Sequence, residues 1–156
     1  MNLQKTFYTI ESTAWIFWRA CHRRSIKQAD AGGKPHVFHD FQADNFNINH
    51  IVVGPAGVFA IETKARSKAV SGDGKKDANA IYNGREIMFS NFNDTKYLDQ
   101  AKRQAKWLST WLKSAVGEPV DVFPVISLPG FYVERKAPYD GIFVINPSCV
   151  RLSFCK

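Results

Sequence analysis

The chain has 156 residues, and its 21 Lys and Arg residues against 14 Asp and Glu residues give a formal net charge of +7. A hydrophobic content of 45%, with no repeat or low-complexity tract, excludes wholesale disorder and fits one globular domain over residues 1–156. The positive balance favours a polyanionic partner such as DNA, although many basic proteins bind no nucleic acid.

Cysteine usage and apolar run length narrow the class of protein further. Cys21, Cys149 and Cys155 are an odd number without CxxC spacing, which argues against a disulfide framework and a zinc knuckle. The apolar run 14–18 is too short for a membrane span, and no signal peptide is recognisable. We therefore expect reduced thiols and a cytoplasmic location.

The first two predicted elements are a helix and a strand. Residues 7–24 carry apolar side chains at three- and four-residue spacing, which predicts a helix with one apolar face. Trp15 and Trp18 widen that face and suit packing or a protein interface better than base stacking. After a loop containing Gly and Pro, residues 36–41 alternate as a strand does.

The next two elements form the best-specified pair in the sequence. Residues 48–53 and 58–63 are rich in β-branched side chains, and residues 54–57 between them include two glycines and a proline. Such a connection is too short for a crossover between parallel strands. We predict an antiparallel hairpin here.

The register of this hairpin brings polar residues together. If Val53 pairs with Val58, antiparallel counting places Asn49 opposite Glu62 on one face of the sheet. Alternation along the second strand puts Lys64 on the same face as Glu62. An amide, a carboxylate and an ammonium would then converge.

The rest of the chain alternates between strands and one long helix. The remaining predicted elements are an exposed loop at 66–78, a second hairpin within 81–89, a helix that Asn93 or Asp94 caps and that runs to about residue 115, and strands at 120–128 and 141–145. The expected apolar face of the helix consists of Leu98, Ala101, Ala105, Leu108, Trp111 and Leu112. A charged segment containing Pro and Gly separates the last two strands. This order predicts an α/β or α+β fold with helices packed on a central sheet.

An acid and a base two residues apart at a strand end have two interpretations. Phosphodiester hydrolysis needs a cation held by oxygens, a nucleophilic water and positive charge near the phosphorus. The carboxylate of Glu62, the carbonyl of Thr63 and the ammonium of Lys64 could supply these parts. An isolated Glu-x-Lys tripeptide is more often a pair of solvated surface charges.

The surrounding sequence resembles a known family. Residues 47–64 read NINHIVVGPAGVFAIETK, similar to the hallmark of the nuclease-related domain (NERD) family: an Ile-Asp-His strand, a Gly-containing turn and Gly-Val-Phe-x-Ile-Glu-x-Lys. Residues 81–112 and 122–130 resemble its hairpin, helix and late strand, so the resemblance covers roughly 36–147. It implies a restriction-endonuclease-like fold, with a mixed central sheet flanked by helices, and a metal site of the PD-(D/E)xK type.

The resemblance also implies roles for individual residues. Glu62 would be a ligand of Mg²⁺ or Mn²⁺, with the carbonyl of Thr63 beside it, and Lys64 would orient the attacking water and stabilise charge. Gln100 would be an auxiliary polar group on the neighbouring helix. Glu11 is the acid of the first helix that would approach the metal.

Asn49 departs from the family pattern, which has a metal-binding aspartate at this position. An amide oxygen can bind Mg²⁺ but brings no charge, so the affinity for the metal should fall. The asparagine is either a natural departure or a near-isosteric inactivating substitution.

His50 lies on the opposite strand face, which favours packing or a backbone bond over catalysis. Asp40 and Asp44 are weaker candidates for a replacement ligand.

Basic residues near these elements are candidates for contacts to a phosphate backbone. They are Arg66 and Lys68 after the Glu-x-Lys strand and Lys102, Arg103 and Lys106 on the long helix. A solvated face is the more frequent meaning of such runs.

Three functional hypotheses follow from the sequence. The first is a Mg²⁺-dependent DNA endonuclease whose activity Asn49 weakens or abolishes. The second is a non-catalytic nucleic-acid-binding module on the same fold. The third is a protein-interaction domain that uses the aromatic first helix to form a homodimer or to dock onto another protein.

Overall fold

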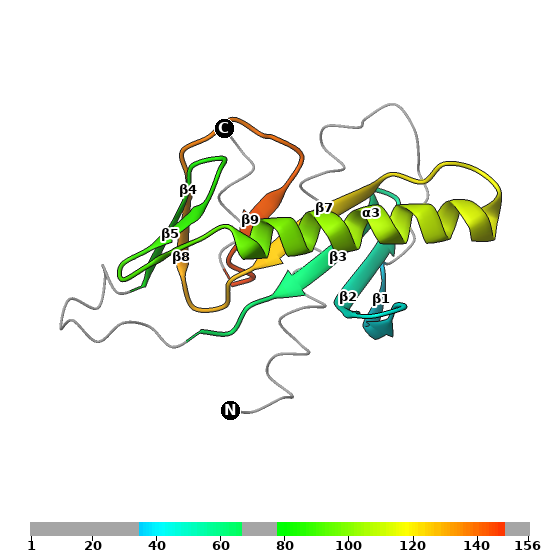
Figure 1. The fold of residues 1–156 in the computed structure, drawn as a ribbon, viewed down its shortest axis with the longest axis horizontal. Helices are drawn as coiled ribbons and strands as arrows, with labels where there is room; N and C mark the ends of the chain where they lie inside the picture. The colour runs from blue at the N-terminus through cyan, green and yellow to red at the C-terminus, as the bar shows by residue number, and fades with distance from the viewer. Residues whose placement is uncertain (1–34, 67–77, 149–156) are drawn as a thin grey trace.

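The computed structural model describes residues 35–66 and 78–148, which form two β-sheets and one long helix (Figure 1). The predicted first helix with Glu11, Trp15 and Trp18, the three cysteines, and Lys68 all lie outside the described residues. Predictions about them therefore stay predictions.

The larger sheet has five strands in the order β1-β2-β3-β7-β9. Their bounds are His36–Gln42, Asn47–Gly54, Gly57–Thr63, Val122–Ser127 and Phe143–Ile145. The pairs β1-β2 and β2-β3 are antiparallel, whereas β3-β7 and β7-β9 are parallel. The sheet is thus mixed, as the family resemblance implies.

The β2-β3 hairpin confirms the predicted register, because Val53 pairs with Val58. Gly54 also pairs with Gly57, so the loop is two residues long, shorter than the predicted four. Gly57 has φ 122, and a Cβ there would lie 3.2 Å from the ring of Phe123. The tight turn therefore depends on a residue without a side chain.

The pairing of strand β1 with β2 is interrupted in the middle of the strand. Asp40 has φ 50 and is the one non-Gly residue with positive φ among those that the structure describes. The residues on either side pair with β2, His39 with His50 and Phe41 with Ile48, but Asp40 does not join the ladder opposite Asn49. Asp is among the few residues that tolerate this conformation.

The smaller sheet has four strands in the order β6-β5-β4-β8. Their bounds are Asn93–Asp94, Ile87–Phe89, Asn79–Tyr82 and Tyr132–Arg135. Strands β4 and β5 confirm the predicted second hairpin, and the Asn83 carboxamide oxygen accepts the backbone N–H groups of Arg85 and Glu86 in its turn.

Strand β8 corrects the sequence-based prediction, which treated this segment only as a separator. Tyr132–Arg135 pairs in parallel with β4, although charged residues and prolines surround it. Its alternation between exposed and half-buried residues spans only four positions, too few to predict a strand against that background.

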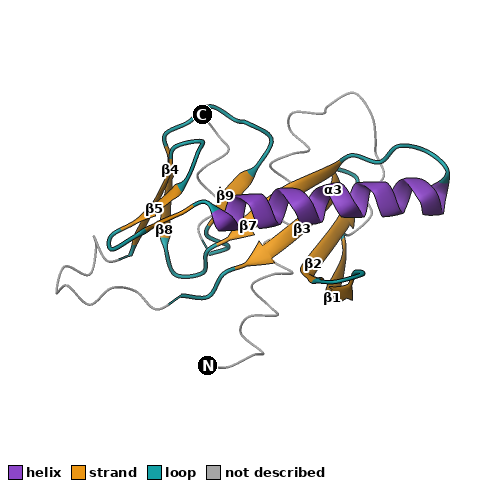
Figure 2. Cartoon of the chain, viewed as in Figure 1, coloured by secondary structure: helices purple, strands orange, loops and turns teal. Residues whose placement is uncertain are grey.

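Helix α3 spans Lys96–Val116 and lies along one face of the larger sheet (Figure 2). Asp94 acts at its start as predicted, since its carboxylate accepts the N–H of Tyr97 at 2.8 Å. Gly117, with φ 83, ends it, and its N–H bonds the carbonyl of Lys113. Of the predicted apolar face, Trp111 differs: it is 44% exposed, because it lies beside the outer strand β1 against Phe41.

Three apolar clusters hold these layers together. One, between α3 and β1 to β3, contains Ile48, Ile51, Ala60, Ala105 and Leu108. A second, on the other face of the larger sheet, contains Val52, Phe59, Ile61, Val125 and Ile145. The third joins the smaller sheet to α3, β7 and β9 through residues such as Tyr82, Leu98 and Ile126. The predicted mixed α/β fold is confirmed, with α3 as the one helix of the described chain.

A polar clamp closes one end of the smaller sheet. Tyr82 is fully buried, and its hydroxyl donates to Asp140, which also pairs with Arg135 at 3.3 Å. Burial and the Asp140 carboxylate raise the pKa of the Tyr82 hydroxyl above its usual range. The clamp ties the segment after β8 back to β4.

No helix in the described ranges is long and apolar enough to cross a membrane.

Candidate active site at the end of strand β3

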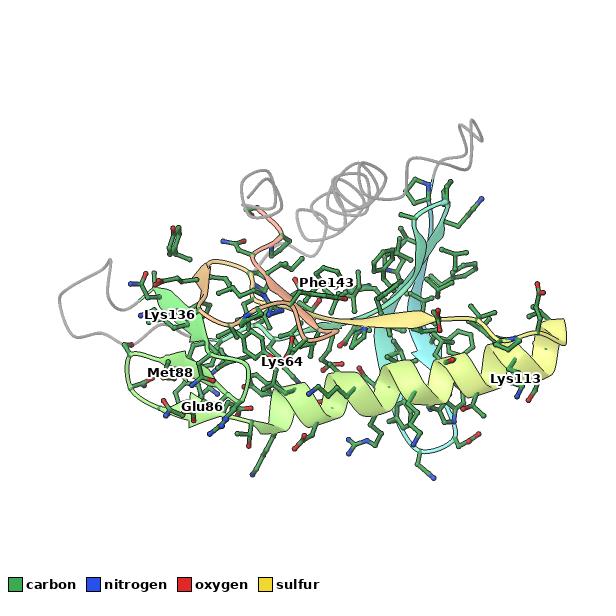
Figure 3. All side chains as sticks on the ribbon, turned by 90° about the horizontal axis from the view of Figure 1, so that it is seen from above. Lys64, Glu86, Met88, Lys113, Lys136 and Phe143 are labelled. Carbon is green, nitrogen blue, oxygen red and sulfur yellow. The ribbon has the colours of Figure 1, made fainter. Side chains whose placement is uncertain are left out.

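The carboxylate of Glu62 and the ammonium of Lys64 meet where β3 ends. Glu62 is only 5% exposed, and its Oε1 lies 2.7 Å from Nζ of Lys64. Figure 3 shows Lys64 beside the N-terminal half of α3. The predicted convergence of these two side chains is therefore present, and Glu62 is not a solvated surface charge.

Helix α3 contributes two glutamines to this site. The Oε1 of Gln100 accepts a hydrogen bond from Lys64 Nζ at 2.8 Å. One turn further along the helix, Gln104 Nε2 donates to Glu62 Oε2 at 2.8 Å and to the carbonyl of Asn47 at 3.0 Å. The helix thus holds both charged groups from the same side.

Asn49 lies at the same strand end. The β2-β3 ladder closes with His50 opposite Ile61, so Asn49 and Glu62 are the next residues along their strands. The Asn49 side-chain oxygen accepts the N–H of Thr63 at 3.3 Å. The amide therefore bonds the backbone beside Glu62, in agreement with the predicted register.

Arg66 continues the basic surface beyond Lys64. Its guanidinium lies 3.9 Å from the centre of the Phe92 ring and donates to the Tyr97 hydroxyl at 2.9 Å. Lys64 Nζ lies 4.9 Å from the centre of the Tyr97 ring. Tyr97, which the sequence did not single out, thus connects the two cations.

Two of the three predicted basic residues of α3 lie away from this site. Lys102 and Lys106 each follow a site glutamine by two positions, which places them about half a helical turn away around the axis. Arg103 lies nearer, three positions after Gln100 on the same flank. All three are exposed.

His50 faces the other side of the sheet. Its Nδ1 lies 2.8 Å from Nδ1 of His39, so the half-buried ring bonds a side chain, where the sequence favoured packing or a backbone bond over catalysis. Burial, and next the neighbouring His39, lower the pKa of His50 from 6.5 to about 4. The ring therefore stays neutral near neutral pH.

The oxygen atoms near Glu62 define what the site could hold. Over residues 35–66 and 78–148, no three His, Cys, Asp or Glu side chains form a group able to bind a metal ion. Asp44 instead accepts the indole N–H of Trp107 at 3.0 Å, and Asp40 is exposed. Glu62 is thus the carboxylate of the site, with the amide of Asn49 beside it.

Gln104 is a second site residue, besides Tyr97, that sequence reasoning missed. It is 1% exposed and lies three positions after Ala101 and four before Leu108, within the apolar stripe of the helix. A polar residue at a core position is a signal that the sequence did contain.

Comparison with known proteins gives one match. The sequence profile of the family described as "Nuclease-related domain" (NERD) matches residues 6–129, a span that begins before the resemblance seen in the motifs and includes β3 and the whole of the described site. No curated protein and no solved structure matches the chain significantly. With most of its length matched, and with a carboxylate, an ammonium and an amide meeting at the end of β3, the chain belongs to the nuclease-related domain family.

Proposed function

We propose that the chain is a metal-dependent DNA endonuclease that hydrolyses phosphodiesters, and that Asn49 lowers its activity. The proposal depends on one observation at the end of β3: Lys64 Nζ contacts both Glu62 Oε1, at 2.7 Å, and Gln100 Oε1, at 2.8 Å. Membership of a nuclease-related family supports the same reaction class.

The donor atoms fit a hard divalent cation in kind. A carboxylate of Glu62, the amide oxygen of Asn49 and the carbonyl of Thr63 are all oxygens, which Mg²⁺ and Mn²⁺ prefer. These three groups together carry little net negative charge, because the Glu62 carboxylate is already paired with Lys64 at 2.7 Å. A cation must therefore compete with the ammonium for Glu62.

Each side chain has a distinct task in the proposed reaction. A bound cation would activate water and neutralise charge on the phosphate. Lys64 supplies a proton donor and a positive charge beside Glu62, and Gln100 orients it by accepting one of its hydrogens. Arg66, which is fixed by Phe92 and Tyr97, offers a second cation for the DNA backbone.

A non-catalytic nucleic-acid-binding module is the second candidate. It is favoured by the charge balance of the site, since Glu62 and Lys64 neutralise each other and Asn49 adds no negative charge. Such a module would use the net charge of +7 without needing a metal.

Plasmid cleavage by the chain and by its Asn49→Asp variant separates the two candidates. Each protein is assayed with Mg²⁺, with Mn²⁺ and with EDTA, and Glu62→Ala in the Asn49→Asp background serves as the control. We expect faster cleavage by Asn49→Asp because the added carboxylate attracts the cation, and loss of cleavage with EDTA or without Glu62. Salt-sensitive DNA binding by all variants, without cleavage by any, would instead establish the binding module.

A further inference from the structure

Gln104 is not explained by packing alone. Its side chain is buried in the apolar stripe of α3, where an aliphatic residue would fill the same space. Its Oε1 has no hydrogen-bond partner in the described part of the chain. A buried oxygen without a partner lowers stability, so the residue calls for another explanation.

The two hydrogen bonds that Gln104 makes fix the orientation of its amide. Both acceptors, Glu62 Oε2 at 2.8 Å and the Asn47 carbonyl at 3.0 Å, face the same Nε2 atom. Turning the amide over would set its oxygen against two other oxygens. Nε2 therefore stays directed at Glu62.

This contact divides the roles of the two carboxylate oxygens. Oε2 accepts the side-chain N–H of Gln104 at 2.8 Å, whereas Oε1 is paired with the Lys64 ammonium at 2.7 Å, which a cation at Oε1 has to displace. We propose that Gln104 is a positioning residue that restricts Glu62 to binding a divalent cation through Oε1 alone. This inference rests on the proposed function, because it assumes that Glu62 is a metal ligand.

A carboxylate restricted to one oxygen discriminates between cations. Mg²⁺ is small, requires nearly ideal octahedral geometry and is bound well by single carboxylate oxygens. Ca²⁺ is larger and readily accepts both oxygens of one carboxylate. Gln104 therefore favours Mg²⁺ over Ca²⁺ at this site.

Calorimetric titration of the metal-free chain with Mg²⁺ and with Ca²⁺ tests the proposal in Gln104→Met. Methionine has a similar volume and no N–H donor, so it frees Oε2. Loss of such an orienting contact should weaken Mg²⁺ binding about 10- to 100-fold. Ca²⁺ binding should change much less, because both carboxylate oxygens become available, and the ratio of the two affinities shifts toward Ca²⁺.

Gln100→Met is the matched control. It removes the partner of Lys64 from the same helix but leaves the Gln104 contact to Glu62 in place. We expect it to change the affinities for Mg²⁺ and Ca²⁺ alike. Far-UV circular dichroism of both variants verifies that they are folded.

A second measurement uses the unaltered chain and so does not depend on how the variant folds. The side-chain amide signals of Gln104 in ¹H–¹⁵N NMR spectra should shift during Mg²⁺ titration with the dissociation constant found by calorimetry. Signals that do not move through saturation would overturn the proposal.

The remaining outcomes distinguish this inference from the proposed function. An equal loss of Mg²⁺ and Ca²⁺ affinity in Gln104→Met overturns the positioning role while the metal site stands. If neither the unaltered chain nor Asn49→Asp binds a divalent cation, the proposed function and the role of Gln104 are both overturned.

Discussion

The buried carboxylate of Glu62 is bonded by protein groups in place of water. Removing a carboxylate from water costs several kcal/mol, and this cost is offset only by close ionic and hydrogen-bonding partners. Each oxygen of Glu62 has one such partner: Lys64 on Oε1 and Gln104 on Oε2. The side chain that defines the site is therefore held from two directions before any ligand arrives.

His50 gives the folded chain a measurable pH dependence. Its folded-state pKa is about 4, below the usual 6.5, so the unfolded chain takes up the proton first as the pH falls. The contribution of neutral His50 to the unfolding free energy is fully present above pH 6.5 and is lost as the pH falls from 6.5 to about 4. We expect about 1–2 kcal/mol of the unfolding free energy to disappear in this window, after allowance for solvent screening of the half-buried ring.

Urea unfolding at a series of pH values measures this effect. His50→Gln should flatten the pH dependence between 6.5 and 4, whereas His36→Gln, at an exposed position of β1, should leave it unchanged. An identical slope in the unaltered chain and in His50→Gln would show that another group titrates.

The sequence could predict some residues of the site and not others, for a physical reason. Asn49 and Glu62 are neighbours across a tight hairpin, so counting from the turn is enough to bring them together. Gln104 reaches Glu62 from a helix far along the chain, and only the packing of α3 on the sheet decides which helix residue faces that carboxylate. The one sequence feature that could have indicated Gln104 as a site residue was its polar side chain within the apolar stripe of the helix.

The β2-β3 hairpin depends on Gly57 for its turn. In Gly57→Ala, the new Cβ would have to tolerate φ 122 and a 3.2 Å approach to the Phe123 ring. We expect the unfolding free energy to fall by about 2–3 kcal/mol, as for a strained backbone conformation. Equilibrium unfolding in urea measures the change.

Gly117→Ala is the comparison for this prediction. Gly117 also has positive φ, 83, but a Cβ there would meet nothing within 4 Å. Its cost should be about 1–2 kcal/mol, from backbone strain alone. A loss in Gly57→Ala no larger than that in Gly117→Ala would mean that the Phe123 contact relaxes freely.

Elements whose own residues show a clear pattern were predictable, and strand β8 was not. Both hairpins and α3 follow from turn residues, periodicity and a capping aspartate. Strand β8 pairs with β4, which lies far earlier in the chain, and its own residues give no strong pattern. The pairing of β8 with the predicted β4-β5 hairpin therefore emerged only from the three-dimensional structure.

At the scale of the whole molecule, only some of the positively charged side chains lie near the site. Lys64 and Arg66 converge near Tyr97, whereas Lys102 and Lys106 lie around the other side of α3. If DNA binds across the end of β3, Arg66 should touch a phosphate and the two helix lysines should not.

The salt dependence of DNA binding tests this distribution. Fluorescence anisotropy of labelled duplex DNA in EDTA gives the slope of log affinity against log salt concentration. Arg66→Gln should reduce this slope by about 1, since one phosphate contact is lost. Lys102→Gln should leave it unchanged, and an equal reduction in both variants would contradict binding across the end of β3.

Strand β1 is an outer strand of the larger sheet among the described strands, and the interruption of its pairing at Asp40 has a consequence for solubility. Outer strands invite other chains to extend the sheet, which leads to aggregation. A strand approaching β1 would lose its register at the left-handed Asp40 and would meet an exposed carboxylate there. Asp40, which interrupts the pairing opposite Asn49, therefore also disfavours edge-to-edge association of the sheet.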